Sequence, residues 1–209
     1  MSNHLFYRVT KRVLDFGIAV IVLGLVWPAL FVVALLVRIK LGSPIIFSQE
    51  RAGLGGRPFQ IYKFRTMVDR RDTEGQLLPD DVRLPPFGRF LRTTSLDELP
   101  QLFNVIVGHM SLVGPRPLFA RYIPRYDTTQ IRRLEVVPGI TGLAQINGRN
   151  AISWEEKFAM DVQYAESACL LLDTKILLRT VAKVLLRSNI SKDGHATMPE
   201  FMGSEGAQR

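Results

Sequence analysis

The sequence predicts an α+β fold that is mainly α-helical, has one small β-hairpin and begins with a helix-break-helix segment seated in a membrane. Three observations predict this fold. Residues 16–37 form an apolar run with Pro28 inside it, two short apolar segments flank a glycine-rich turn at 52–58, and helical periodicity dominates after residue 96. The 209 residues suit a membrane element at 1–40 followed by a single folded domain at 41–209.

The apolar run is long enough to cross a bilayer, since residues 16–37 at about 1.5 Å each span roughly 33 Å. A break at Trp27-Pro28, however, leaves two arms that each reach only about the bilayer midplane. The flanks are basic on both sides, at Arg8, Lys11, Arg12, Arg38 and Lys40. Because positive flanks stay in the cytoplasm, we favour a re-entrant helix that enters and leaves by one face. A kinked spanning helix remains the alternative, since membrane helices tolerate proline.

The net charge of +8 is unevenly distributed along the chain. Residues 1–71 contain eleven Lys or Arg and three Asp or Glu, which accounts for the whole excess. This placement beside the apolar run is typical of a surface that faces anionic membrane lipids. A nucleic-acid-binding protein spreads basic and aromatic residues over its folded body, so we expect no nucleic-acid partner. Cys169 is the only cysteine, which excludes an intrachain disulfide, and its apolar neighbours predict a buried side chain.

The domain after the apolar run begins with a predicted hairpin over 44–67, followed by a polar loop over 68–86. Helices are predicted over 97–107, within 118–135, from Ser153, where Glu156 completes a capping box, and from Asp173. The last helix places Ile176, Leu177 and Val181 on one face. Its other face has four cations, Lys175, Arg179, Lys183 and Arg187. That basic face lies either on a membrane or in solvent.

Asp97 and Glu98 are the candidate catalytic residues. Ser95 and Glu98 also have the spacing of an ordinary capping box, which is the structural alternative. A helix that starts at Asp97 instead places Pro100 harmlessly in its first turn. On either choice Asp97 lies near the positive end of a helix, which favours its ionised form. An ionised carboxylate can attack phosphorus, and its neighbour can bind a divalent cation that also binds phosphates.

Basic side chains accompany this acidic pair along the chain. They are Lys63, Arg92, Arg116, which lies between two prolines, and Arg149 in a turn-rich segment. Arginine matches phosphate oxygens with two parallel hydrogen bonds, so this set suits a polyanionic substrate. Each of these residues alone is more often part of a surface ion pair.

Four motifs together resemble one family of bacterial enzymes. They are Tyr62–Met67 (YKFRTM), Thr94–Asn104 (TSLDELPQLFN), Ser111–Pro117 (SLVGPRP) and Pro138–Gly142 followed by Gln145–Asn150. From Lys11 to Gly203 the chain resembles the bacterial sugar transferases called monotopic phosphoglycosyl transferases. It is most similar to the short members that consist of the catalytic core, of the diacetylbacillosamine-1-phosphate transferase type.

This resemblance implies a membrane enzyme at the cytoplasmic face of the bacterial inner membrane that initiates glycoconjugate biosynthesis. It implies transfer of a sugar 1-phosphate from a UDP-sugar to undecaprenyl phosphate with release of UMP. An N-acetylated amino or diamino sugar is the expected sugar of the donor, with galactose or glucose as the alternative. Asp97 would form a covalent phosphosugar intermediate and Glu98 would bind Mg²⁺. The phosphates or nucleotide would contact Lys63, Arg92, Arg116 and Arg149.

The membrane break implied by the family falls at Trp27-Pro28, where members often have Ser instead of Trp27. A homo-oligomer is compatible with the sequence. The alternative function is a non-catalytic lipid-binding or assembly protein of the same fold, located at the membrane surface.

Overall fold

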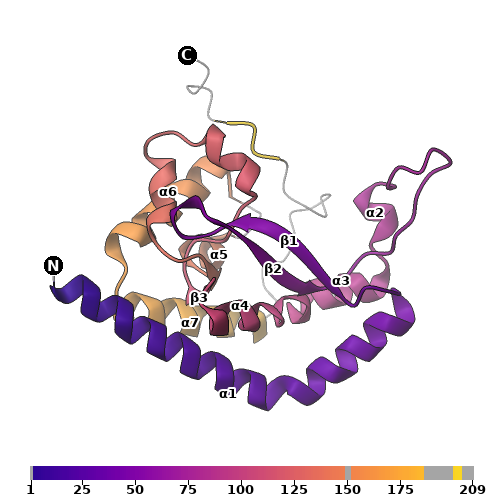
Figure 1. Ribbon diagram of the computed structural model, residues 1–209, viewed down its shortest axis with the longest axis horizontal. Coiled ribbons are helices and arrows are strands. Elements are labelled where there is room, and N and C mark those ends of the chain that lie inside the picture. The colour runs from indigo at the N-terminus through magenta and orange to yellow at the C-terminus, as the bar shows by residue number, and fades with distance from the viewer. Residues whose placement is uncertain (1, 149–151, 186–199, 204–209) are drawn as a thin grey trace.

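In the computed structural model, which describes residues 2–148, 152–185 and 200–203, one long helix runs along a side of the molecule. This helix, α1 (Ser2–Lys40), is bent, and the other elements lie on the inner side of the bend (Figure 1). Pro28 lies inside the helix. A proline removes one helical hydrogen bond and clashes with the preceding turn, so it bends a helix without ending it. The predicted break is therefore a bend within one continuous helix.

The first arm of α1 is bound to the folded domain by polar contacts. Lys11 Nζ donates to Asp173 Oδ2 at 2.9 Å. Arg12 donates to the backbone carbonyls of Val105 at 2.5 Å and Ile106 at 2.6 Å. The charge pattern predicted that these two cations face lipid headgroups, whereas in the structure they bind the protein. Their positive charges neutralise an internal carboxylate and the carbonyl end of a neighbouring helix.

The second arm of α1 packs through an apolar stripe. Val33 and Val37, together with Leu41 just after the helix, are buried against Phe64 and Leu91 of the domain. Most of the other large apolar side chains of α1 are exposed, Trp27 among them. Among the described residues, α1 is the one helix that is long and apolar enough to cross a membrane, and this rests on length and composition alone.

The predicted hairpin is confirmed. Strands β1 (Ile46–Ala52) and β2 (Pro58–Phe64) pair antiparallel, with Ile46 opposite Phe64. They are joined by a single 3₁₀ turn, η1 (Leu54–Gly56), in which Gly55 has a φ of 62°. That left-handed conformation explains why glycine stands there. A second sheet, which the sequence analysis missed, pairs β3 (Ser111–Val113) in parallel with β4 (Gly139–Thr141).

Helices make up most of the rest. In chain order they are α2 (Asp80–Arg83), α3 (Pro86–Thr93), η2 (Leu96–Glu98), α4 (Gln101–Val107), η3 (Ala120–Arg125), η4 (Gln130–Glu135), α5 (Leu143–Asn147), α6 (Trp154–Ser167) and α7 (Leu170–Leu185). The capping box at Ser153 is confirmed, since Ser153 and Glu156 exchange both hydrogen bonds. The α-helix predicted within 118–135 is instead two 3₁₀ segments. The segment predicted as a polar loop over 68–86 contains the short helix α2.

The C-terminal helix departs from its prediction in three details. It begins at Leu170 rather than Asp173. Ile176 is fully buried as predicted, but Val181 from the same predicted face is 58% exposed. Cys169, predicted to be buried, is exposed. The residue precedes the helix and lies on the surface of the turn that joins α6 to α7, where an apolar neighbourhood in sequence does not produce burial.

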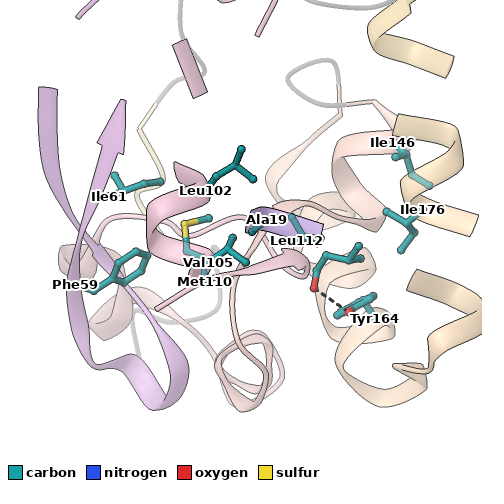
Figure 2. Packing of buried hydrophobic residues seen from close by; sticks show 11 residues of the cluster. Ala19, Phe59, Ile61, Leu102, Val105, Met110, Leu112, Ile146, Tyr164 and Ile176 are labelled. Atoms are coloured by element: carbon teal, nitrogen blue, oxygen red, sulfur yellow. Dashed lines mark hydrogen bonds between the residues drawn. The ribbon is translucent and has the colours of Figure 1, made fainter. Parts of the chain in front are cut away.

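The main core brings α1, β2, α4, α6 and α7 together (Figure 2). Tyr164 is buried there, and the single proton of its hydroxyl is shared between two acceptors. They are Asp173 Oδ1 at 2.6 Å and the carbonyl of Val113 at 3.0 Å, and the second contact is drawn in Figure 2. Asn104 of α4 is fully buried and binds β2 twice: its side chain donates to the carbonyl of Gln60 at 2.7 Å and accepts from the N–H of Tyr62 at 3.1 Å. These two bonds fix α4 against β2, and the acidic pair lies in the short segment just before that helix.

Candidate active site

Asp97 and Glu98 lie in the 3₁₀ turn η2 and not in the first turn of a helix. Ser95 adopts a left-handed conformation with a φ of 56°, and its side chain makes no capping hydrogen bond. Helix α4 starts only at Gln101, with Pro100 just before it. Both local interpretations from the sequence, a capping box at Ser95 and a helix start at Asp97, are therefore wrong. The Glu98 side chain does not cap a helix and instead binds Lys63 and Arg116.

Glu98 is bound by two of the predicted cations. Its Oε1 accepts from Lys63 Nζ at 2.7 Å and from Arg116 Nη2 at 2.5 Å, and its Oε2 has one long contact of 3.5 Å with Arg116 Nη1. Burial alone would raise the pKa of Glu98, but Arg116 and Lys63 together hold that pKa well below its ordinary value. Glu98 is thus a carboxylate at any physiological pH. It joins two segments that lie 35 and 18 residues away in the chain.

Asp97 has a different environment from its neighbour. The residue is 6% exposed, and its Oδ1 is buried without a hydrogen-bond partner. Burial and then the charge of Glu98 raise the pKa of Asp97 to about 6, although Lys63, Arg116 and Arg92 act in the opposite direction. A position near a helix start predicted that the ionised form of Asp97 is favoured, whereas burial dominates and favours the neutral form. Near neutral pH, Asp97 is still largely ionised and one oxygen is not masked by a donor.

Arg92 and Arg149 are the other two cationic residues predicted for the site, and the structure describes only Arg92. Arg92, on α3, donates from Nε to Thr66 Oγ1 at 3.0 Å, and its charge acts on Asp97. Burial lowers the pKa of Arg92, and Asp97 opposes that shift. Arg149 lies outside the described residues. The structure therefore brings Lys63, Arg92 and Arg116 to the acidic pair.

Arg116 is held in place by a buried ion pair that the sequence analysis missed. Arg133 of η4 donates from Nη2 to the backbone carbonyl of Arg116 at 2.6 Å. The same guanidinium bonds Asp161 Oδ2 at 2.7 and 3.1 Å, and both side chains are only 1% exposed. An arginine and an aspartate 28 residues apart give no local signal, so only the tertiary structure identifies this pair.

Glycines bring the Arg116 motif close to the Pro138–Gly142 motif. A Cβ added at Gly114 would lie 2.4 Å from the carbonyl oxygen of Val137, and one at Gly139 would lie 2.0 Å from the N of Gly114. Neither contact is sterically allowed, so both positions need glycine. The N–H of Gly139 donates to the carbonyl of Pro115 at 3.0 Å, which fixes the backbone next to Arg116.

A metal site made by protein side chains alone is absent from the described residues, where no group of three or more His, Cys, Asp and Glu is arranged to hold an ion. Mg²⁺ in phosphate-handling sites commonly takes only one or two carboxylates and completes its shell with substrate phosphates and water. The lightly engaged Oε2 of Glu98 fits such a shared site. Glu98 could hold Mg²⁺ only together with a phosphate-bearing ligand.

The chain matches known proteins along nearly its whole length. A family model described as "Bacterial sugar transferase" matches residues 6–187. The chain is 53% identical to the sugar transferase EpsL of Bacillus subtilis, over 94% of this chain and 97% of EpsL. It is 41% identical to a UDP-glucose:undecaprenyl-phosphate glucose-1-phosphate transferase of Caulobacter vibrioides, over 86% of this chain and 71% of that protein.

A longer relative also contains the region. The chain is 44% identical to the galactosyl transferase CpsE of Streptococcus agalactiae, over 87% of this chain and 44% of CpsE, so it spans less than half of that relative. The range that the family model matches includes the acidic pair and the three cationic residues near it, Lys63, Arg92, Asp97, Glu98 and Arg116. The chain belongs to the bacterial sugar transferase family.

Proposed function

We propose that the protein is a phosphoglycosyl transferase that moves a sugar 1-phosphate from a UDP-sugar to undecaprenyl phosphate and releases UMP. The observation that carries the proposal is Asp97, a buried carboxylate with one unpartnered oxygen among three cationic side chains. The Caulobacter relative is named for this reaction with UDP-glucose. An ordinary structural carboxylate would have both oxygens hydrogen-bonded.

The chemistry assigned to Asp97 is nucleophilic. Its free oxygen attacks the phosphorus that bears the sugar, the bond from that phosphorus to the bridging oxygen breaks, and UMP leaves with the bond electrons. A phosphate oxygen of undecaprenyl phosphate then attacks the same phosphorus and releases Asp97 as the carboxylate. Lys63, Arg92 and Arg116 stabilise the negative charge that develops on the phosphate oxygens. Glu98 holds Lys63 and Arg116 in position for this role.

We infer that Mg²⁺ binds at Glu98, shared with the phosphates of the donor. When bound, the ion neutralises charge on the departing UMP. Lys63 and Arg116 both engage Oε1, so Oε2 is the oxygen left for a metal. The Glu98→Ala variant should abolish turnover or raise the Mg²⁺ concentration needed for half-maximal activity at least tenfold. An unchanged Mg²⁺ dependence would remove Glu98 from the metal role.

The proposed location is the cytoplasmic face of the bacterial inner membrane, with α1 as a re-entrant helix. Support comes from its two arms, which bind one and the same domain. Lys11 of the first arm bonds Asp173, and Val37 of the second arm packs with Phe64 and Leu91. A folded domain does not straddle a bilayer, so both ends of α1 belong on its side. The phosphate of the lipid acceptor, at the membrane surface, then lies on the same side of the membrane as the domain that contains Asp97.

The covalent step is tested without lipid acceptor. Enzyme mixed with UDP-sugar should release about one UMP per active site and gain the mass of the phosphosugar. Asp97→Asn should lose both signals while the circular dichroism spectrum stays that of the wild type. The control is Glu155→Gln, an exposed carboxylate on α6, which should keep both. UMP formed only when undecaprenyl phosphate is present, with no mass gain in a single turnover, would instead indicate direct transfer.

The donor sugar is identified by a UMP-release screen. UDP-activated N-acetylated amino and diamino sugars are the donors we expect. UDP-glucose and UDP-galactose belong in the same screen, because relatives are named for glucose and galactose. Release of UMP from none of them, with membrane binding retained after loss of Asp97 and Glu98, would favour a non-catalytic lipid-binding protein.

A further inference from the structure

An apolar groove of about 550 Å³ opens between α1, the hairpin and α4. Its walls come from the second arm of α1, from the strand ends nearest that arm and from the start of α4. The lining residues are Leu30, Phe31, Ala34, Ile46, Tyr62, Phe64, Pro100 and Phe103. Of these side chains, only Tyr62 has a polar atom.

The groove presents large apolar side chains to the outside. Phe31 is 67% exposed and Phe103 is 54% exposed. Contiguous exposed apolar surface is uncommon on folded domains and marks binding sites for apolar ligands or membranes. The volume also lies within the range of small-molecule sites, about 300–1,000 Å³. The groove is therefore large enough for a segment of hydrocarbon chain.

The groove and the acidic pair are built from the same two chain segments. On β2, Lys63 bonds Glu98, while Tyr62 and Phe64 on either side of it line the groove. Successive side chains of a strand point to opposite faces, so β2 presents its cation on one face and its apolar side chains on the other. Pro100, two residues after Glu98, lines the groove as well. A ligand whose phosphate binds Lys63 on one face of β2 can thus extend around the edge of this strand and place its hydrocarbon in the groove on the other face.

We propose that this acceptor groove, defined by the eight lining residues above, binds the isoprene units nearest the phosphate of a polyprenyl phosphate. The inference rests on the proposed function, which supplies the acceptor. In a polyprenyl phosphate, hydrocarbon begins directly at the phosphate ester oxygen. A phospholipid has a glycerol and two carboxylic esters at the same depth, and their oxygens would meet apolar walls with only the Tyr62 hydroxyl as a partner. The wall chemistry selects the polyprenyl chain.

Photolabelling tests the occupant directly. The full chain is placed in phosphatidylcholine–phosphatidylglycerol nanodiscs with undecaprenyl phosphate that has a diazirine in its second isoprene unit. We expect labels on peptides with Phe31, Tyr62 or Phe103, reduced at least fivefold by unlabelled undecaprenyl phosphate. Labels elsewhere, or equal groove labelling by a diazirine phosphatidylglycerol that undecaprenyl phosphate does not displace, would overturn the proposal.

A kinetic test uses matched substitutions on α1. Ala34→Trp fills the groove and should raise the KM for undecaprenyl phosphate at least tenfold. Leu35→Trp, the next residue, which is 51% exposed and outside the groove, should change that KM less than twofold. If Ala34→Trp does not fold, a second pair repeats the test. Phe103→Ser alters the groove, and its control, Val107→Ser, alters an exposed residue of the same helix. Equal KM values within each pair would contradict the groove.

The two proposals fail separately. Photolabelling needs no UDP-sugar, so labelled groove peptides in a protein that never releases UMP would refute the proposed function and keep the groove. Release of UMP by a protein whose groove is never labelled would support the proposed function and refute the acceptor groove.

Discussion

Asp97 is held where its charged form is disfavoured, and the reaction assigned to it needs that charged form. With a pKa of about 6, the carboxylate is mostly protonated below pH 6 and mostly ionised above it. We expect lipid-independent UMP release to be constant above about pH 7 and to fall about tenfold per pH unit below 6. Stopped-flow measurement between pH 4.5 and 8.5 checks this, with binding of UDP-sugar measured in parallel. A rate that is independent of pH across this range would contradict a titrating Asp97.

The same shift predicts that activity and stability respond in opposite directions to Asp97→Asn. The pKa of Asp97 is raised above its ordinary value of 3.8, so the folded state binds the proton more tightly than the unfolded state. Stability therefore rises as the pH falls from about 6 towards 4, and the ionised group costs at most about 3 kcal/mol above pH 6. Asp97→Asn should raise Tm by several degrees at pH 8 and by little at pH 4.

Thermal unfolding in one detergent at both pH values measures the difference. Glu155→Gln is again the control, since it alters an exposed carboxylate and should shift Tm by less than about 1 °C. A lower Tm for Asp97→Asn at pH 8 would indicate that the ionised carboxylate stabilises the fold.

At the scale of elements, η4 and α6 support the segment that presents Arg116. Arg133→Met leaves Asp161 as a buried charge without its partner and should destabilise the fold by about 3–5 kcal/mol. Arg133→Met combined with Asp161→Leu removes both charges and should recover most of that loss. The double variant should still have a raised KM for UDP-sugar, because the Arg116 carbonyl has lost its donor. Wild-type KM in a stable double variant would show that the pair is only structural.

Local patterns predicted the elements whose causes are local. The hairpin depends on a turn that only glycine adopts easily, and α6 begins at Ser153 because two residues three apart exchange hydrogen bonds. The strands β3 and β4 were missed since each is three residues long and its partner is distant in sequence. A two-residue periodicity cannot be recognised in so short a segment.

The residue types of the candidate site predicted that some of its side chains meet, but they did not predict the environment of each. Lys63, Arg116 and Glu98 meet as expected from their motifs. The raised pKa of Asp97 follows from burial by segments far away in the chain, and the sequence contains no measure of that. Lys11 was likewise assigned to lipid because its partner, Asp173, comes 162 residues later.

At the scale of the whole molecule, the described C-terminal residues return to the body of the domain. Phe201 is 2% exposed and packs edge-on to Phe158, with ring centroids 4.9 Å apart. Glu200 pairs with Arg125 at 3.0 Å. Phe201→Ala should destabilise the protein by about 3–5 kcal/mol, the usual cost of such a cavity. The control is Met202→Ala, at a side chain that is 74% exposed, which should change the free energy of unfolding by less than about 0.5 kcal/mol. Urea titration of both variants and the wild type measures these changes.

The proposed re-entrant course of α1 predicts on which side of the membrane the N-terminus lies. Because Lys11 and Val37 contact one domain, a re-entrant α1 places residues 2 and 48 on the same face. After replacement of the exposed Cys169 by Ser, single cysteines at Ser2 and Ser48 should both resist a membrane-impermeant maleimide in intact cells and react after permeabilisation. A spanning helix would expose only Ser2→Cys to the outside, and would require the Lys11–Asp173 bond to break in the membrane-bound protein.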